Sequence, residues 1–300
     1  MNIDKLYESV SAKGHVCVGL DTSIEYVPEL ERKKAVNDAE AVLAFNKALI
    51  DATFDTAACF KVQIAYYEEM GLCGLKAYSE TLKYIKQKGC LSIADIKRGD
   101  IADTASRYVK AHFSGEFEAD FVTISPYMGM DSIDPWLKEA QKTGKGAFVL
   151  MRTSNPGMKD FQKLRLTAED TEENNSSSRL YNIVGNKMQN LAISNTGKHG
   201  YGIFGVVVGC TEREEAADIR KSYSSLFFLI PGYGAQGGAA ADVALLLNRG
   251  NGGVVNASRS IITAWKTEKI ENADNKAAAD AAKRAAVKMR DEIRESLNEQ

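Results

Sequence analysis

Eight short apolar runs, each followed by a segment with helical spacing, constrain the fold of this chain more than any other feature. They lie at His15–Asp21, Ala58–Gln63, Leu91–Ile101, Phe121–Tyr127, Gly146–Thr153, Gly202–Gly209, Leu226–Ile230 and Gly252–Arg259. Buried strands that alternate with helices are typical of parallel βα units, and eight such units make a (β/α)8 TIM barrel. A doubly wound open sheet is the alternative, but the glycine-rich dinucleotide fingerprint is missing after the first run. We therefore predict an α/β fold formed by one (β/α)8 barrel.

The segments between the runs predict helices and contain no linker. The expected helices cover residues 1–13, 33–52, 74–88, 106–113, 133–143, 179–194, 239–248 and 275–300. Thr211–Glu214 resembles a capping box at a further helix start. Lys159–Ser178 is polar and predicts an exposed loop insertion. We expect one domain over residues 1–300, with this insertion near 159–178.

Composition excludes several classes of function. The formal net charge of −2 provides no basic field for nucleic acid. No apolar run reaches the length of a membrane span, and the first residues lack a signal-peptide pattern. The five cysteines are odd in number and show no C-x-x-C spacing, and the three histidines are scattered. We therefore expect a cytoplasmic protein with free thiols, without a metal site and without nucleic-acid or membrane partners.

The third apolar run ends in a cluster of charges. Asp95 and Lys97 are two positions apart in a strand, so their side chains project from the same face, and Asp100 follows the turn that Gly99 permits. An ammonium group between two carboxylates is held protonated, because opposite charges favour its charged form. Such a lysine suits proton donation better than Schiff-base chemistry, which needs a neutral amine. A purely structural salt bridge at a strand end is the alternative interpretation.

In a (β/α)8 barrel the C-terminal ends of all strands face one mouth, so polar residues there can be grouped. They are Asp21, Lys61, Gln63, Asp95, Lys97, Asp100, Ser125, Thr153, Ser154, Gln236 and Arg259. Buried charges persist when they are paired, and this set alternates in sign. The glycine-rich segment Pro231–Gly238 and the pair Ser258-Arg259 stand where barrels commonly bind phosphate. A tight loop without a ligand is the alternative for the glycines, but the arginine favours a phosphate monoester.

These motifs resemble those of the orotidine 5′-phosphate decarboxylase family, most closely its longer bacterial branch. Asp95-Ile96-Lys97-Arg98-Gly99-Asp100 matches the D-x-K-x-x-D signature of that family. The other matching segments are Val18–Asp21, Phe60–Gln63, Pro231–Gly238 and Ala257–Arg259. The resemblance covers nearly the whole predicted barrel. D-x-K-x-x-D alone also occurs in related phosphosugar enzymes, so the motifs are specific only in combination.

The resemblance implies decarboxylation of orotidine 5′-monophosphate to uridine 5′-monophosphate, the last step of pyrimidine synthesis, without a cofactor. Lys97 would protonate C6 of the pyrimidine as CO2 leaves, and Asp95 would lie against the substrate carboxylate. Lys61 would complete the charge array and contact the ribose, which Asp21 would also bind. Gln63 is grouped with the substrate-binding residues.

The resemblance also implies a homodimer with shared active sites. Asp100, with Ile101 and Thr104 near it, would reach the active site of the neighbouring subunit. The remaining contacts expected with substrate are Ser125 or Thr153 and Ser154 at the pyrimidine edge, Pro231 along the cavity, and Gln236 and Arg259 at the 5′-phosphate.

Two rival functions are also compatible with the sequence. A phosphosugar lyase or decarboxylase on the same barrel would use a divalent metal to stabilise an enediolate. Phe60–Gln63 argues against it, because Lys61 stands where a metal site would want a carboxylate. The second rival is a non-catalytic barrel that binds a phosphate ligand, which would tolerate loss of Lys97.

Overall fold

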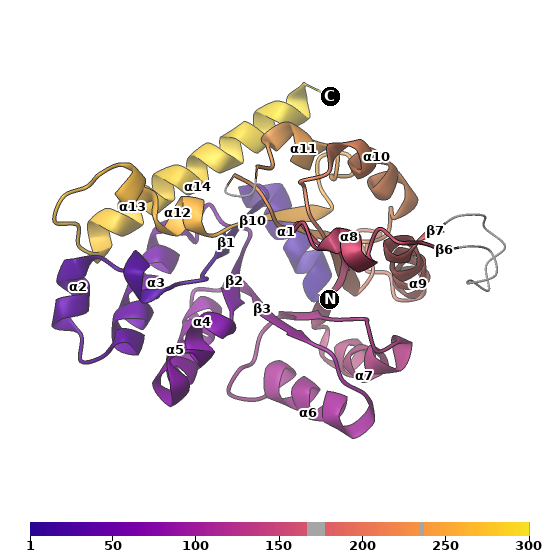
Figure 1. The fold of residues 1–300 in the computed structure, drawn as a ribbon, viewed down its shortest axis with the longest axis horizontal. Helices are drawn as coiled ribbons and strands as arrows, with labels where there is room; N and C mark the ends of the chain where they lie inside the picture. Colours follow the sequence, from indigo (N-terminus) through magenta and orange to yellow (C-terminus); the bar gives the residue numbers. More distant parts are fainter. Residues whose placement is uncertain (167–177, 235–236, 300) are drawn as a thin grey trace.

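The computed structural model describes residues 1–166, 178–234 and 237–299 and contains a closed barrel of eight parallel strands (Figure 1). The barrel strands are β1 (Val16–Gly19), β2 (Cys59–Gln63), β3 (Leu91–Arg98), β4 (Phe121–Ile124), β5 (Gly146–Arg152), β8 (Phe204–Val208), β9 (Phe228–Ile230) and β10 (Gly253–Ala257). Their order around the barrel is β1-β10-β9-β8-β5-β4-β3-β2, and each neighbouring pair is parallel. Each expected apolar run contains one of these strands, so the predicted (β/α)8 barrel is confirmed and the open sheet is wrong.

Helices surround the barrel, as Figure 1 shows. They are α1 (Asn2–Lys13), α2 (Glu29–Lys34), α3 (Asp38–Thr53), α4 (Ala65–Glu68), α5 (Gly71–Gln87), α6 (Ala102–Phe113), α7 (Asp134–Thr143), α8 (Met158–Phe161), α9 (Leu180–Ser194), α10 (Arg213–Ser222), α11 (Ala240–Ala244), α12 (Arg259–Ile262), α13 (Ala264–Thr267) and α14 (Asn275–Asn298). Two short 3-10 turns, η1 (Ile24–Tyr26) and η2 (Met130–Ser132), complete the described helical structure.

Two helix predictions need correction. The single helix expected over 33–52 is interrupted after Lys34, where α2 ends, and α3 begins only at Asp38, because the Asn37 side chain accepts a hydrogen bond from the Glu40 backbone N–H and caps a new helix. The expected capping box is absent at α10, whose N-cap is Glu212 without a side-chain cap bond. The Thr211 hydroxyl instead donates to the Ser154 carbonyl oxygen, which ties this loop to the end of β5.

The insertion near 159–178 is more regular than the loop that its composition predicts. It begins within α8 and continues into β6 (Arg165–Leu166), which pairs antiparallel with β7 (Ser178–Arg179) (Figure 1). Residues 167–177 of the insertion lie outside the described residues. Its two ends therefore form a short hairpin beside the barrel.

The interior of the barrel is apolar at its N-terminal end. One buried cluster takes a residue from each of the eight strands, which is possible only inside the closed barrel: Cys17, Cys59, Ile93, Phe121, Phe148, Val207, Leu229 and Val254. Ile3, Leu6 and Val10 of α1 belong to the same cluster, so this helix closes the N-terminal end. The amphipathic pattern of residues 1–13 is explained by that position.

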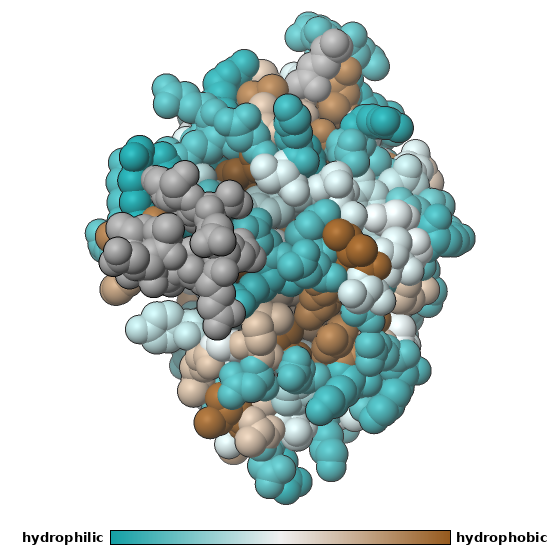
Figure 2. All heavy atoms as spheres, turned by 90° about the vertical axis from the view of Figure 1, so that its right-hand side faces the viewer, coloured by the Kyte–Doolittle hydropathy of each residue, from teal (hydrophilic) through white to brown (hydrophobic). Residues whose placement is uncertain are grey.

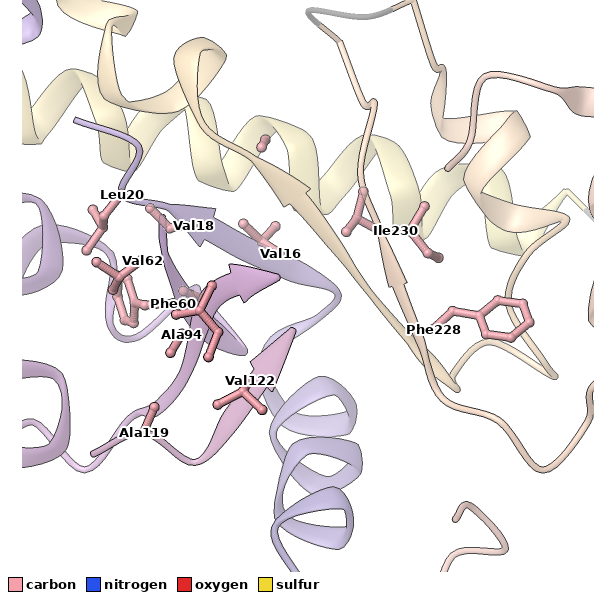
Figure 3. Close-up of a cluster of buried hydrophobic side chains, with 14 of the residues drawn as sticks. Val16, Val18, Leu20, Phe60, Val62, Ala94, Ala119, Val122, Phe228 and Ile230 are labelled. Carbon is pink, nitrogen blue, oxygen red and sulfur yellow. The ribbon is translucent and has the colours of Figure 1, made fainter. Parts of the chain in front are cut away.

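A second, larger cluster lies between the strands and the surrounding helices. In β1, Val16 and Val18 belong to this outer cluster, whereas Cys17 between them belongs to the inner one. Figure 3 shows side chains of this outer cluster on β1, β2, β3, β4 and β9, including Phe60 and Ile230. Because both faces of each strand are buried, the strands read as continuous apolar runs in the sequence.

Figure 2 shows one face of the molecule, which is mainly polar. On the face turned toward the viewer in Figure 2, hydrophobic residues form small separate groups among hydrophilic ones. None of the helices in the described residues combines the length and the apolar character needed to cross a membrane.

Candidate active site

Inside the barrel, the layer of side chains next to the inner apolar cluster, on the C-terminal side of the strands, is polar. Cys59 and Ile93 of that cluster are followed two positions later by Lys61 and Asp95, which point to the same side of their strands. Thr123 stands in the same relation to Phe121. The change from apolar to charged side chains at one level of the barrel therefore forms the floor of its C-terminal mouth.

The charged groups of this floor form a continuous chain. The Lys61 Nζ lies 2.9 Å from Asp21 Oδ1 and 2.9 Å from Asp95 Oδ2. Lys97 Nζ lies 2.6 Å from the other oxygen of Asp95, Oδ1. The order is thus Asp21, Lys61, Asp95, Lys97, with alternating signs. Each buried carboxylate or ammonium group has a partner of opposite charge, as buried charges require.

Neutral donors complete the hydrogen bonding of the two carboxylates. The Thr123 hydroxyl donates to Asp95 Oδ1 at 2.8 Å, and the Ser258 hydroxyl donates to Asp21 Oδ2 at 2.8 Å. A side chain at Gly19 would collide with this arrangement, because its Cβ would lie 2.0 Å from Ser258 Oγ. Glycine at this inward-facing position of β1 therefore leaves room for Ser258 to reach Asp21.

Charge pairing offsets burial in this chain. Burial opposes the charged form of Lys61, but the Asp21 and Asp95 carboxylates hold its pKa above the ordinary value. Burial likewise opposes ionisation of Asp95, but Lys61 and Lys97 hold the pKa of its carboxyl well below its usual range. Asp95 is therefore a carboxylate and Lys61 an ammonium group at neutral pH.

Lys97 differs from Lys61 in its access to the cavity. Its side chain is 48% exposed, compared with 6% for Lys61. Its backbone is in the left-handed region with φ at 47°, and the pairing of β3 with β4 shifts register between Ala94 and Arg98. The Thr123 hydroxyl accepts the backbone N–H groups of Ile96 and Lys97, each at 3.0 Å. This bulge directs the lysine into the mouth while its amino group stays bonded to Asp95.

A cavity of about 450 Å³ opens above these charges, at the C-terminal ends of the strands. Its size is within the range common for small-molecule sites. The predicted site residues that line it are Asp21, Lys61, Gln63, Asp95, Lys97, Thr153, Ser154, Pro231 and Arg259. The structure therefore brings together residues on β2 and β3 with residues that follow β1, β5, β9 and β10.

One end of the cavity is lined by Arg259 and by the glycine-rich segment after β9. Gly232 and Gly234 have φ values of 103° and 67°, which glycine adopts without strain. The backbone N–H of Gly238 donates to the Gly232 carbonyl oxygen, which closes the loop on itself. Arg259 is exposed and forms no ion pair with a carboxylate in the described part of the chain. Gln236, predicted for the same end, lies outside the described residues.

The other end of the cavity is formed by the residues after β5. Thr153 and Ser154 line it together with Asn155. The Gln162 side chain, which comes from the start of the insertion, bonds to Thr153. Polar groups thus cover both ends of the cavity, with the charged floor between them.

Four predicted site residues do not line the cavity of their own chain as it is described. Asp100, Ile101 and Thr104 lie beyond β3 at the start of α6, and Asp100 Oδ1 accepts the Ile101 backbone N–H at 2.8 Å. Ser125 lies after β4, where its backbone N–H donates to the Arg98 carbonyl oxygen. Ile101 is 44% exposed.

Several lining residues were not predicted. They are Tyr26, Tyr66, Thr123, Leu150, Asn155, Val207, Leu229, Asn256 and Ala257, whereas Gly232, Tyr233 and Ser258 belong to the two segments predicted to bind phosphate. Inward alternation along β4 would have indicated Thr123, since it follows Phe121 by two positions. Tyr26 and Tyr66 lie in connections whose path no strand pattern reveals. No group of three or more His, Cys, Asp or Glu side chains in the described residues is arranged to hold a metal ion.

Comparisons with known proteins agree with this geometry. A family model described as "Orotidine 5'-phosphate decarboxylase / HUMPS family" matches residues 14–273. Orotidine 5'-phosphate decarboxylase of Clostridium perfringens (strain SM101 / Type A) is 53% identical over 297 residues, which cover 99% of each chain. The Clostridium kluyveri protein of the same name is 53% identical over 293 residues, 98% of this chain and 97% of that protein. A structure of Leishmania donovani OMP decarboxylase gives a TM-score of 0.71 at 31% identity, covering 96% of this chain and 98% of that one.

Proposed function

This chain belongs to the orotidine 5'-phosphate decarboxylase / HUMPS family, and we propose that it decarboxylates orotidine 5′-monophosphate with Lys97 as the proton donor. The reaction yields uridine 5′-monophosphate and CO2, which makes the protein a carboxy-lyase of pyrimidine synthesis. Within the family, the phosphosugar alternative loses support because relatives about half identical over the full chain carry the decarboxylase name. One observation supports the assignment of Lys97 as the proton donor. Lys97 is the exposed last member of the series Asp21, Lys61, Asp95, Lys97, and its side chain lines the cavity.

The chemistry follows from that chain of charges. When the bond between C6 and the carboxylate carbon breaks, its electron pair stays on C6, and the pyrimidine acquires carbanion character. The Lys97 ammonium group stabilises this developing charge and transfers its proton to C6, and the neutral amine then regains a proton from water. Asp95 holds the ammonium group in place at 2.6 Å and lies against the substrate carboxylate, whose departure relieves the repulsion between like charges.

The remaining cavity residues bind the rest of the nucleotide. The Asp21 carboxylate accepts a hydrogen bond from a ribose hydroxyl, the Lys61 ammonium group donates one to a ribose hydroxyl, and Gln63 borders the same region. Thr153 and Ser154 contact the pyrimidine edge, and Pro231 lines the cavity. Arg259, together with Gln236, binds the 5′-phosphate. Binding energy gained at the phosphate orients the reacting carbon, so it contributes to turnover as well as to affinity.

The direct test is a spectrophotometric assay of orotidine 5′-monophosphate decarboxylation in the presence of EDTA. We expect full turnover, because a fixed ammonium group and its carboxylate partners supply the charge stabilisation and the proton that the reaction needs. Loss of activity that added divalent metal restores would favour metal-dependent chemistry. Absence of turnover with or without metal would favour a barrel that only binds a phosphate ligand.

Arg259→Ala is expected to weaken binding of uridine 5′-monophosphate by about 10- to 150-fold, the value of a lost charge-assisted bond of about 1.5–3 kcal/mol. Binding of uridine, which lacks the phosphate, should change little. Titration of both ligands into wild type and variant measures the difference. Equal losses for the two ligands would place the guanidinium away from the phosphate.

We further propose a cytoplasmic homodimer of single-domain subunits. Barrel strands extend from Val16 to Ala257, and α1 and α14 pack on the same barrel, which supports a single domain formed by the described residues. All five cysteines are free thiols, which suits a reducing compartment. Asp100, Ile101 and Thr104 stand outside their own cavity at the start of α6, which supports their contribution to the active site of a second subunit.

A further inference from the structure

The start of the insertion supplies a side chain that bonds to Thr153 at one end of the cavity. Gln162 follows α8, is half-buried, and directs its amide group at Thr153. We propose that Gln162 is a positioning residue that fixes the Thr153 hydroxyl as a hydrogen-bond acceptor for the N3–H group of the pyrimidine. This inference rests on the proposed function, because it assigns Thr153 to the pyrimidine edge.

The hydrogen-bond directions around Thr153 follow from its backbone. The Thr153 backbone N–H is a donor only, and it lies 2.8 Å from Gln162 Oε1, so the amide oxygen must face it. The amide nitrogen then faces the hydroxyl and donates to Thr153 Oγ1 at 2.9 Å. The orientation of the amide is therefore determined, although oxygen and nitrogen have similar shapes.

The single hydroxyl proton of Thr153 is donated to Asn155. Asn155 Oδ1 lies 2.6 Å from Thr153 Oγ1, closer than Gln162 Oε1 at 3.3 Å, and receives that proton. A hydroxyl has one proton and two lone pairs, and Gln162 Nε2 occupies one of the lone pairs. What Thr153 offers to a ligand in the cavity is the second lone pair, which accepts an N–H group.

Gln162 can perform this role because its backbone is held on two sides. Its N–H donates to the Met158 carbonyl oxygen at 2.8 Å, and its carbonyl oxygen accepts the Tyr181 N–H at 3.0 Å. Lys163, the next residue, pairs with Glu212 of the loop before α10 at 2.5 Å. The insertion is thus fastened to both α9 and α10, and its first turn forms a fixed support for the end of β5.

The chemistry of the ligand that this arrangement selects is specific. A pyrimidine with an oxo group at C4 carries a proton on N3, as orotate and uracil do, whereas cytosine has an unprotonated N3. A hydrogen-bond acceptor at Thr153 therefore favours uracil and orotate, whose N3 carries a proton. With cytosine, the lone pair of N3 would face the lone pair of the Thr153 hydroxyl and repel it. Sites built to receive one hydrogen-bonding pattern discriminate strongly against the opposite one.

The test compares dissociation constants for uridine and cytidine 5′-monophosphate, which differ only at C4 and N3. We expect wild type to prefer the uridine nucleotide, and Gln162→Met to lower that preference by about fivefold, the typical effect of one neutral hydrogen bond. Thr153→Val should lower it by a similar factor. Because Gln162 acts through Thr153, the double variant should show no further loss beyond Thr153→Val.

Two additional variants separate positioning from simple support. Gln162→Glu keeps the shape and the acceptor for the Thr153 N–H but removes the donor to the hydroxyl, so the preference should also fall. Lys159→Met removes an exposed lysine of α8 that takes no part in fastening the insertion, and it should leave the preference unchanged. An equal fall in Lys159→Met, or additive losses in the double variant, would overturn the inference.

The same preparations distinguish this inference from the proposed function. If wild type decarboxylates orotidine 5′-monophosphate while Gln162→Met and Gln162→Glu keep the wild-type preference and the wild-type KM, only the positioning role is wrong. If wild type shows no turnover, the proposed function itself fails. Under the inference, both Gln162 variants raise KM for orotidine 5′-monophosphate more than they lower kcat.

Discussion

Lys97→Ala is expected to lower kcat for orotidine 5′-monophosphate by at least about 10²- to 10⁴-fold, the range that a positioned acid contributes. Under the proposed mechanism, the variant removes both the proton that C6 receives and the ammonium group that stabilises the developing carbanion. Asp95 then keeps only Lys61 as a cationic partner, so the pKa of its carboxyl rises toward the usual range. Steady-state turnover of purified variant and wild type measures the loss.

The fold should survive this change, because Lys97 is the exposed end of the charge chain and Lys61 stays buried between two carboxylates. Binding of uridine 5′-monophosphate, which carries no carboxylate at C6, should therefore remain measurable. Lys110→Ala is a matched control, since it removes an exposed lysine of α6 outside the cavity. More than a small fraction of wild-type kcat in Lys97→Ala would refute Lys97 as the proton donor.

The sequence predicts the barrel and its charged floor for one physical reason. Strand side chains alternate with a period of two, so polar residues that follow inward-facing apolar ones by two positions must also face inward. Lys61 after Cys59 and Asp95 after Ile93 obey this rule, and the structure places both in one ion-pair chain. Because all strands are parallel, their C-terminal ends meet at a single mouth.

The features that the sequence did not predict depend on departures from regular strands or on long-range contacts. Alternation puts Lys97 on the face of Asp95, but it does not reveal the bulge and the positive φ that aim its side chain. Ser258 reaches Asp21 only because Gly19 on the adjacent strand lacks a side chain. Gln162 lies in a polar insertion whose composition predicts only exposure, although its amide lies against the end of β5.

A mixture of Lys97→Ala and Asp100→Ala subunits is expected to regain activity that neither variant has alone. Asp100 follows β3 by two residues, yet it does not line the cavity that Lys97 faces in the described structure. If its carboxylate completes the active site of a second subunit, each site takes Lys97 from one chain and Asp100 from the other. A symmetric dimer makes this exchange reciprocal.

The activity regained by mixing the Lys97→Ala and Asp100→Ala subunits can be calculated. With free exchange in an equimolar mixture, about half of the dimers contain one subunit of each kind. Such a dimer has one site with both residues and one site with neither, so about a quarter of all sites are restored. Activity should rise toward a quarter of the wild-type value after mild dissociation and reassociation, as measured by the decarboxylation assay.

A second mixture provides the matched control. Asp95 and Lys97 are bonded within one chain at 2.6 Å, so a mixture of Asp95→Ala with Lys97→Ala leaves at least one lesion in every site however the subunits combine. That mixture should stay inactive under the same exchange. Recovery confined to the Asp100 mixture would establish that the site is shared between subunits, because only residues from different chains can be separated in this way. If labelled subunits exchange and the Asp100 mixture still shows no recovery, Asp100 acts within its own chain.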